Sequence, residues 1–166
     1  TMQKLDEYGI YHTGSYALPE DKKPLVVTRN GISIGVVSYT DISNQKPGKD
    51  EAFMLDRYNE ELLSADIAAV KQAGAEFVVV YIHWGKENTH DVSSRQRKMA
   101  KFIADAGADL ILGSHAHCTQ PFGSVETERS TVPVIYSLGN FISSMGRTIN
   151  KDSVIVNFTL EKDYIT

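Results

Sequence analysis

Two histidines one residue apart follow a short apolar run, and a third histidine follows another such run. His115 and His117 come after residues 110–112, and His83 comes directly after residues 77–82. Residues two apart in extended backbone point to the same side, so the imidazoles of His115 and His117 can converge on one ion or on two neighbouring ions. Neutral imidazole is a common ligand of divalent transition metals. The three histidines are therefore the predicted metal ligands.

The segments that lead into these histidines resemble each other. Ala73–Glu76 and Ala106–Asp109 both read Ala-Gly-Ala followed by an acidic residue, and each precedes an apolar run with histidine beyond it. This repeat predicts two successive αβ units. Right-handed crossovers would make the two strands parallel, so their carboxyl ends would lie at one edge of the sheet, where open α/β sheets bind ligands. His83, His115 and His117 are expected to share that edge.

Turn signals and β-rich runs indicate the other strands. An Asn-Gly pair predicts a tight hairpin between strands at residues 25–28 and 32–39. Two further strands are predicted at residues 132–137 and 153–160. The last of these alternates enough to be a half-exposed edge strand or a strand of a second sheet.

Two helices are predicted between the strands. Apolar residues spaced by three and four over residues 55–70 indicate an amphipathic helix that ends at Gly74. The second helix has Ser93 and Gln96 in capping-box relation at its start and ends at Gly107. Both helices have the position expected of crossover connections.

Composition limits the possible architectures and partners. The chain has 166 residues, of which 42% are hydrophobic, which is enough for one ordinary core and one domain. Its net charge of -4 and scattered basic residues argue against nucleic acid as a partner. No apolar run approaches the roughly 18 to 20 residues that span a bilayer. The single Cys118 excludes an internal disulfide and leaves the compartment open.

The first residues indicate an abrupt start. Residues 5–14 are typical of the last turn of a helix that runs into Gly9 and a short extended segment, with no preceding cap. We therefore expect this sequence to be the later part of a longer protein. The missing targeting signal then says little about location.

Three motifs carry a resemblance to a known family. His83–Glu87, Gly107–Pro121 and Tyr136–Phe141, in this order, resemble motifs of the bacterial capsule-synthesis protein CapA family, which is associated with poly-γ-glutamate. That family resembles the calcineurin-like metallophosphoesterases. The resemblance implies an α/β fold of mixed β-sheets layered with helices. Residues 1–166 would form the C-terminal part of a single domain of this kind.

The resemblance also implies a ligand set for two divalent ions. His83 and His115 would bind one metal, and His117 would bind the other. The superfamily's Asp-x-His, bridging Asp and Asn-His motifs have no counterpart here, so half of the site is expected to precede this chain. Imidazole ligands favour Mn, Fe or Zn over Ca. The chain alone is expected to bind metal weakly or not at all.

Departures from the family pattern and ordinary structural roles limit the other candidates. Ser114, Ala116 and Cys118 differ from the residues expected in the family, but none of them removes a ligand. Glu87, His90 and Asn140 are candidates for orienting a ligand or lining the substrate groove. For four more residues a structural role is the stronger expectation. Trp84 is expected to be a buried aromatic and Cys118 a buried thiol. Asp41 is expected to form a turn, and His12 is expected to lie on the surface.

Two classes of function follow from the resemblance. The first is metal-dependent phosphoester hydrolysis by the intact protein in capsule or poly-γ-glutamate biosynthesis. The second is a non-catalytic component of capsule polymer assembly, export or anchoring that keeps the fold. The expected partners are an anionic polymer or phosphoester substrate, together with the missing first half of the domain or another chain. The family also suggests the bacterial cell surface, with anchoring through an absent N-terminal region.

Overall fold

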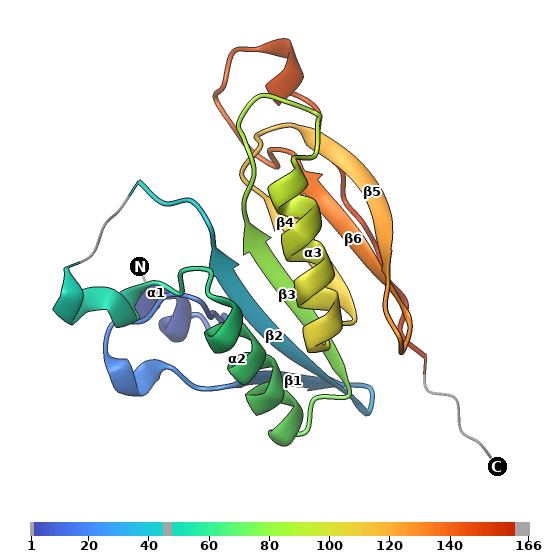
Figure 1. Ribbon diagram of the computed structural model, residues 1–166. Helices are drawn as coiled ribbons and strands as arrows, with labels where there is room; N and C mark the ends of the chain where they lie inside the picture. The colour runs from blue at the N-terminus through green and yellow to red at the C-terminus, as the bar shows by residue number, and fades with distance from the viewer. Residues whose placement is uncertain (1, 45–47, 162–166) are drawn as a thin grey trace.

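A mixed β-sheet with two long helices on one side forms the centre of the protein (Figure 1). The computed structural model describes residues 2–44 and 48–161. Within these residues the sheet has six strands in the order β1-β2-β3-β4-β6-β5. The strands are β1 Leu25–Arg29, β2 Ile32–Thr40, β3 Phe77–His83, β4 Leu110–Ser114, β5 Thr119–Glu126 and β6 Thr131–Leu138. The helices are α1 Met2–Glu7, α2 Glu60–Gln72 and α3 Ser94–Ala106, and short 3-10 turns occupy Pro19–Asp21, Lys49–Met54 and Thr148–Asn150.

The centre of the sheet is parallel, as the repeated αβ units predicted. β2 pairs with β3, β3 with β4 and β4 with β6, all in parallel register. β1 and β2 form the predicted antiparallel hairpin, in which Asn30 and Gly31 have φ values of 51° and 77°. Positive φ at both central residues is the geometry of the tight turn that Asn-Gly favours. The carboxyl ends of β2, β3 and β4 consequently meet at one edge.

The helix termini follow the predicted cap chemistry, with one correction. The side chain of Ser93 accepts a hydrogen bond from Gln96 N at the start of α3, and Gly107 ends that helix with a φ of 113°. The predicted start of the earlier helix at residue 55 is wrong, because α2 begins after Asn59, whose side chain accepts from Leu62 N. Leu55 instead bridges Ser15, and Tyr58 N donates to the backbone of Thr40.

One predicted strand is absent from the described residues, and one strand was not predicted. Residues 153–160 do not form a ladder within the described part of the chain, apart from an isolated bridge between Gly139 and Ser153. Apolar alternation alone gives a strand only where a neighbouring backbone is available for pairing. β5 was missed because it is a largely exposed edge strand that, among the described residues, pairs with β6 alone, so its sequence lacks an apolar run.

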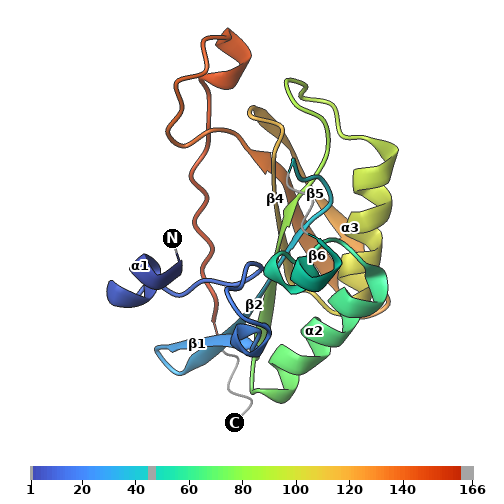
Figure 2. The ribbon, with the colours of Figure 1, turned by 90° about the vertical axis from the view of Figure 1, so that its left-hand side faces the viewer.

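The two faces of the sheet are covered unequally. The side chains toward α2 and α3 are fully buried, among them Val80, Ile82 and Ile111. On the opposite face, Tyr81, Leu112, Ile135 and Phe122 form a cross-strand row in register, and Tyr81 and Phe122 are 39% and 54% exposed. Figure 2 shows both long helices on one side of the sheet and the segment leading to the C-terminus on the other. This second face is therefore apolar and partly open.

Candidate functional site

The structure brings the three predicted histidines together at the carboxyl edge of the sheet. His83 is the last residue of β3, and His115 and His117 follow the end of β4. Nδ1 of His115 lies 3.1 Å from Nε2 of His83, and their ring centroids are 4.4 Å apart. The ring centroids of His115 and His117 are 6.1 Å apart. Their common location follows from the parallel strands, while their role as metal ligands stays a prediction.

The backbone reason given for this convergence is wrong. β4 ends at Ser114, and His115 and His117 have φ values of 103° and 58° rather than extended conformations. Positive φ is uncommon for residues other than glycine and often marks functional sites. The two imidazoles therefore approach each other through a strained turn and not through the alternation of a strand.

His83 has a defined tautomer. Its Nδ1 lies 3.0 Å from the carbonyl oxygen of Ile42, and the hydroxyl of Thr40 donates to the same carbonyl at 2.6 Å. A carbonyl oxygen only accepts, so Nδ1 of His83 carries the proton and Nε2 keeps its lone pair. This is how metal-binding imidazoles are usually oriented. The lone pair of Nε2 is directed toward His115.

Of the three residues predicted to orient a ligand or line the groove, Asn140 and Glu87 lie near His117 and His90 does not. Asn140 Oδ1 lies 2.9 Å from His117 Nδ1, so Asn140 orients this ring directly. Glu87 Oε1 is 3.9 Å from His117 Nε2, which is too far for a hydrogen bond but places a carboxylate beside the free nitrogen. His90 turns elsewhere, with Nδ1 2.6 Å from the carbonyl of Thr119.

The three histidines and Glu87 border a cavity of about 390 Å³, whereas Asn140 and His90 are not among its described lining residues. The lining includes Thr40, Tyr81, His83, Glu87, His115 and His117. Burial lowers the pKa of His115 from its ordinary value of 6.5, and the nearby positive form of His83 lowers it further, while Glu87 opposes the shift. His115 is consequently neutral at pH 7, the form in which imidazole binds metals.

We expect the imidazole of His115 to titrate below pH 6.5 in the metal-free protein, because burial disfavours its charged form. As the pH falls below 6.5, the unfolded chain binds this proton before the folded chain does. The contribution of neutral His115 to stability is therefore complete above pH 6.5 and is lost as the pH falls through the lower folded-state pKa. An NMR titration of the histidine ring signals measures this. A midpoint at or above 6.5 would contradict it.

The four residues expected to be structural make ordinary contacts. Trp84 is fully buried and donates from Nε1 to the carbonyl of Tyr136 at 2.9 Å. Cys118 is buried, donates to the carbonyl of Thr89, and has a thiol pKa raised by burial. Asp41 accepts two hydrogen bonds from Arg95, and His12 contacts Asp6.

A group of three or more His, Cys, Asp or Glu side chains able to hold a metal ion does not occur in the part of the chain that the structure describes. The pair of facing nitrogens from His83 and His115 is the closest approach between the predicted ligands. Two supports of these histidines were missed by the sequence interpretation, namely the carbonyl of Ile42 and the amide of Asn150. Ile42 lies in a polar loop and Asn150 in the 3-10 turn Thr148–Asn150, and neither segment has a motif that would have indicated the contact.

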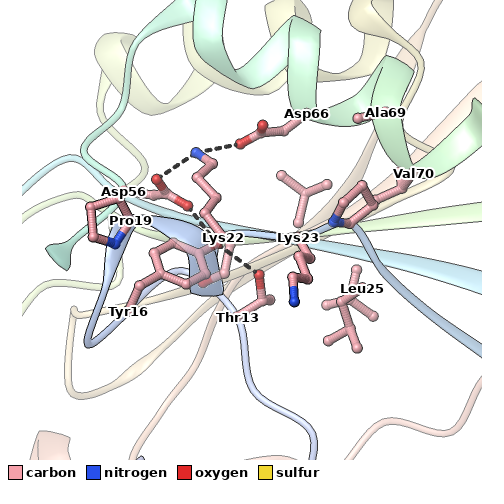
Figure 3. A pocket seen from close by; sticks show the side chains of 14 residues that line it. Thr13, Tyr16, Pro19, Lys22, Lys23, Leu25, Asp56, Asp66, Ala69 and Val70 are labelled. Carbon is pink, nitrogen blue, oxygen red and sulfur yellow. Dashed lines mark hydrogen bonds and ion pairs between the residues drawn. The ribbon is translucent and has the colours of Figure 1, made fainter. Parts of the chain in front are cut away.

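A second cavity, of about 400 Å³, lies beside a polar cluster that the sequence also did not reveal (Figure 3). Lys22 Nζ lies 2.7 Å from Asp56 and 2.9 Å from Asp66. Tyr16 donates to Asp56 and Tyr39 donates to Asp66. Burial acts to lower the pKa of Lys22, but its bonds to Asp56 and Asp66 outweigh burial and raise it. Because Lys22 is shared by Asp56 and by Asp66 on α2, the cluster fastens the N-terminal segment to α2.

Replacing Lys22 by methionine is expected to lower the free energy of unfolding by about 2 kcal/mol, because it leaves two carboxylates without their shared cation. The loss is smaller than for a fully buried pair, since the Lys22 side chain is 32% exposed. Lys23→Met is the matched control at an exposed position. Urea denaturation of both variants measures the difference, and equal stabilities would show that the cluster does not fasten the segment.

The fold is of the α/β class, in which open parallel sheets generally bind ligands at the carboxyl edge of their strands. Comparison with protein families specifies the class further. The model of the family described as "Bacterial capsule synthesis protein PGA_cap" matches residues 1–145. The chain belongs to this family.

Two curated relatives agree with the family assignment. The chain is 35% identical over 168 residues to "PGA biosynthesis protein CapA" of Bacillus subtilis (strain 168). The matched region covers 97% of this chain and 40% of the relative. It is 32% identical over 166 residues to "Capsule biosynthesis protein CapA" of Bacillus anthracis, and this matched region covers 96% of this chain and 39% of that relative. The chain thus spans about 40% of the length of either relative.

The fold of this chain can be compared with that of a solved structure. A crystal structure of a hypothetical protein from Thermus thermophilus has 15% sequence identity and a TM-score of 0.45, and it covers 71% of this chain and 39% of its own. That score is too low to establish a common fold.

Over the residues described, each helix is too short or too polar to cross a membrane.

Proposed function

We propose that this chain supplies His83, His115 and His117 to a divalent-metal site of the calcineurin-like metallophosphoesterase type. The intact protein would use this site to hydrolyse a phosphoester in bacterial capsule or poly-γ-glutamate biosynthesis. Membership of the PGA_cap family and the printed names of the two relatives support the biosynthetic context. The arrangement of the histidines supports the chemistry.

The observation that carries the proposal is the approach of His83 Nε2 to His115 Nδ1 at 3.1 Å. Two nitrogens bound to one ion at about 2.1 Å, at roughly a right angle, lie about 3 Å apart, so this spacing suits a shared metal. His83 already presents a lone pair, because its other nitrogen donates to Ile42. His115 needs only to move its proton from Nδ1 to Nε2 to become the second ligand.

The donor set indicates which metals are compatible. Imidazole nitrogens suit Mn, Fe or Zn, whereas Ca prefers oxygen ligands. Glu87 adds a carboxylate near His117 Nε2 and can contribute an oxygen donor on that side. Since the chain spans about 40% of its relatives, we propose that the remaining ligands come from the rest of the intact protein.

The residues of this chain perform three tasks in the proposed reaction. Ile42 and Thr40 fix the tautomer of His83, burial keeps His115 neutral, and Asn140 orients the ring of His117. When bound, two divalent ions would activate a water molecule and hold the phosphoryl group. The chain's own contribution is thus to present three lone pairs without reorganisation of the rings, except for the proton on His115.

Metal analysis combined with a phosphodiesterase assay on the intact protein tests the proposal. Hydrolysis of bis(p-nitrophenyl) phosphate should disappear after chelation and return on addition of Mn²⁺, Fe²⁺ or Zn²⁺. Protein that neither retains metal nor hydrolyses the ester with any of these ions would contradict the proposal. Protein that binds metal but hydrolyses no phosphoester would instead support the non-catalytic role in capsule assembly, export or anchoring.

A further inference from the structure

His117 is held by two asparagines from the segment that follows β6. Asn140 Nδ2 and Asn150 Nδ2 lie 3.2 Å and 3.0 Å from the carbonyl oxygen of His117, so both lone pairs of this oxygen are occupied. Asn150 is 2% exposed, and its amide also donates to Asn88 Oδ1 at 2.9 Å. Because Asn88 lies in the loop after β3, the two asparagines tie three loops together at the carboxyl edge.

The contacts of Asn140 determine the orientation of its amide. Its Nδ2 donates to two carbonyl oxygens, those of His117 and Asn150, at 3.2 Å and 3.1 Å. A flipped amide would place its oxygen against both of these acceptors, so the nitrogen must face them. The Asn140 oxygen is therefore the atom that lies 2.9 Å from His117 Nδ1.

This orientation determines where the proton of His117 lies. An amide oxygen only accepts, so Nδ1 of His117 must donate and Nε2 keeps its lone pair. The free Nε2 lies on the side of the carboxylate of Glu87. Asn140 thus does for His117 what the carbonyl of Ile42 does for His83.

Gly139 allows Asn140 to reach this position. Gly139 has a φ of 79°, and a Cβ at this residue would lie 2.5 Å from the carbonyl oxygen of Asp152. The chain can turn here directly after β6 only with glycine. The amide of Asn140 is consequently placed by the backbone and not by a flexible loop.

We propose that Asn140 is a positioning residue that locks His117 in the Nδ1-protonated tautomer and in its left-handed backbone conformation, with Asn150 as the second support of the His117 carbonyl. The consequence for metal binding rests on the function proposed above. The tautomer itself does not, because it follows from hydrogen bonds present without metal. The two parts can therefore be tested separately.

The first test is the tautomer of His117, read from ¹⁵N–¹H long-range NMR correlations of the metal-free protein at about pH 8, where histidine is neutral. The wild-type protein should show His117 protonated on Nδ1. Asn140→Ala should shift the tautomer ratio toward Nε2 protonation by at least about fivefold, the effect of one ordinary hydrogen bond. The exposed Asn157→Ala is the matched control and should leave the spectrum of His117 unchanged.

A conservative variant keeps the test decisive if Asn140→Ala does not fold. Asn140→Asp retains an oxygen that accepts from His117 Nδ1 but cannot donate to the carbonyls of His117 and Asn150. It should keep the Nδ1 tautomer. A wild-type spectrum for His117 in Asn140→Ala, or Nε2 protonation in Asn140→Asp, would overturn the proposal.

The second test follows the metal. Mn²⁺ added to the intact protein, which contains this chain, should broaden the ring signals of His117, and the concentration at half effect should rise 10-fold to 100-fold in Asn140→Ala, the range for lost ligand-orienting contacts. If Mn²⁺ broadens no histidine signal in the intact wild-type protein, the proposed function fails while the tautomer assignment stands. If the midpoint is the same in wild type and Asn140→Ala, the positioning role toward metal is overturned.

Discussion

Replacing His115 by alanine in the intact protein is expected to lower kcat/KM for phosphodiester hydrolysis by about a thousandfold and to reduce the bound metal. Metal ions contribute several kcal/mol to such reactions, and about 4 kcal/mol corresponds to that factor. His115 is the most sensitive position because its Nδ1 lies against His83 Nε2 at 3.1 Å. Steady-state kinetics and metal analysis of the purified variant measure both effects.

Two further variants separate loss of the ligand from disturbance of the backbone. His115 has a φ of 103°, so His115→Ala removes the imidazole but keeps the backbone strain of a residue with a Cβ, whereas His115→Gly removes both. Both variants should lose activity to a similar extent. His12→Ala is the control, since His12 contacts Asp6 outside the cavity of the three histidines. Full activity and normal metal content in His115→Gly would rule out His115 as a ligand.

Replacing Gly113 by alanine is expected to lower the free energy of unfolding by about 3 kcal/mol or more, because the added Cβ would overlap two groups that are held in place. A Cβ at Gly113 would collide with the carbonyl oxygen of Tyr136 and with Nε1 of Trp84. Overpacking usually costs about 1 to 3 kcal/mol, and here neither the strand backbone nor the buried indole can yield easily. The added methyl group would separate β4 from β6 and break the Trp84–Tyr136 hydrogen bond.

Gly146→Ala is the matched control, because nothing lies within 4 Å of a Cβ at Gly146 and its φ is not positive. Urea unfolding followed by far-UV circular dichroism gives both free energies. The near-UV signal of Trp84 should change in Gly113→Ala and stay the same in Gly146→Ala. A loss of less than about 1 kcal/mol in Gly113→Ala would mean that the strands adjust more easily than the register suggests.

Local patterns in the sequence predicted the parts of the fold that depend on neighbouring residues. The αβ repeat located β3 and β4, the Asn-Gly turn located the β1–β2 hairpin, and the Ser93–Gln96 box located the start of α3. These signals work because a turn or a cap is formed within a few residues. The common edge of the three histidines followed from strand direction alone.

Contacts between distant segments could not be predicted in this way. The left-handed turn at His115 and His117 depends on asparagines 23 and 33 residues beyond His117. The hydrogen bonds of the cluster around Lys22 join residues 27 to 40 positions apart, with no spacing that a single sequence reveals. The apolar alternation of residues 153–160 is real, but a strand also needs a partner backbone, which local sequence cannot supply.

The positive φ values of His115 and His117 have a consequence for the evolution of this edge. Such conformations cost residues other than glycine on the order of 1 kcal/mol or more each, and the surrounding hydrogen bonds must offset that cost. Thermal stability and the retention of histidine therefore oppose each other at both positions. Variants selected for thermostability alone should therefore carry glycine or asparagine at these two sites. In random libraries screened for heat resistance, His115 and His117 should be replaced before residues of ordinary backbone conformation.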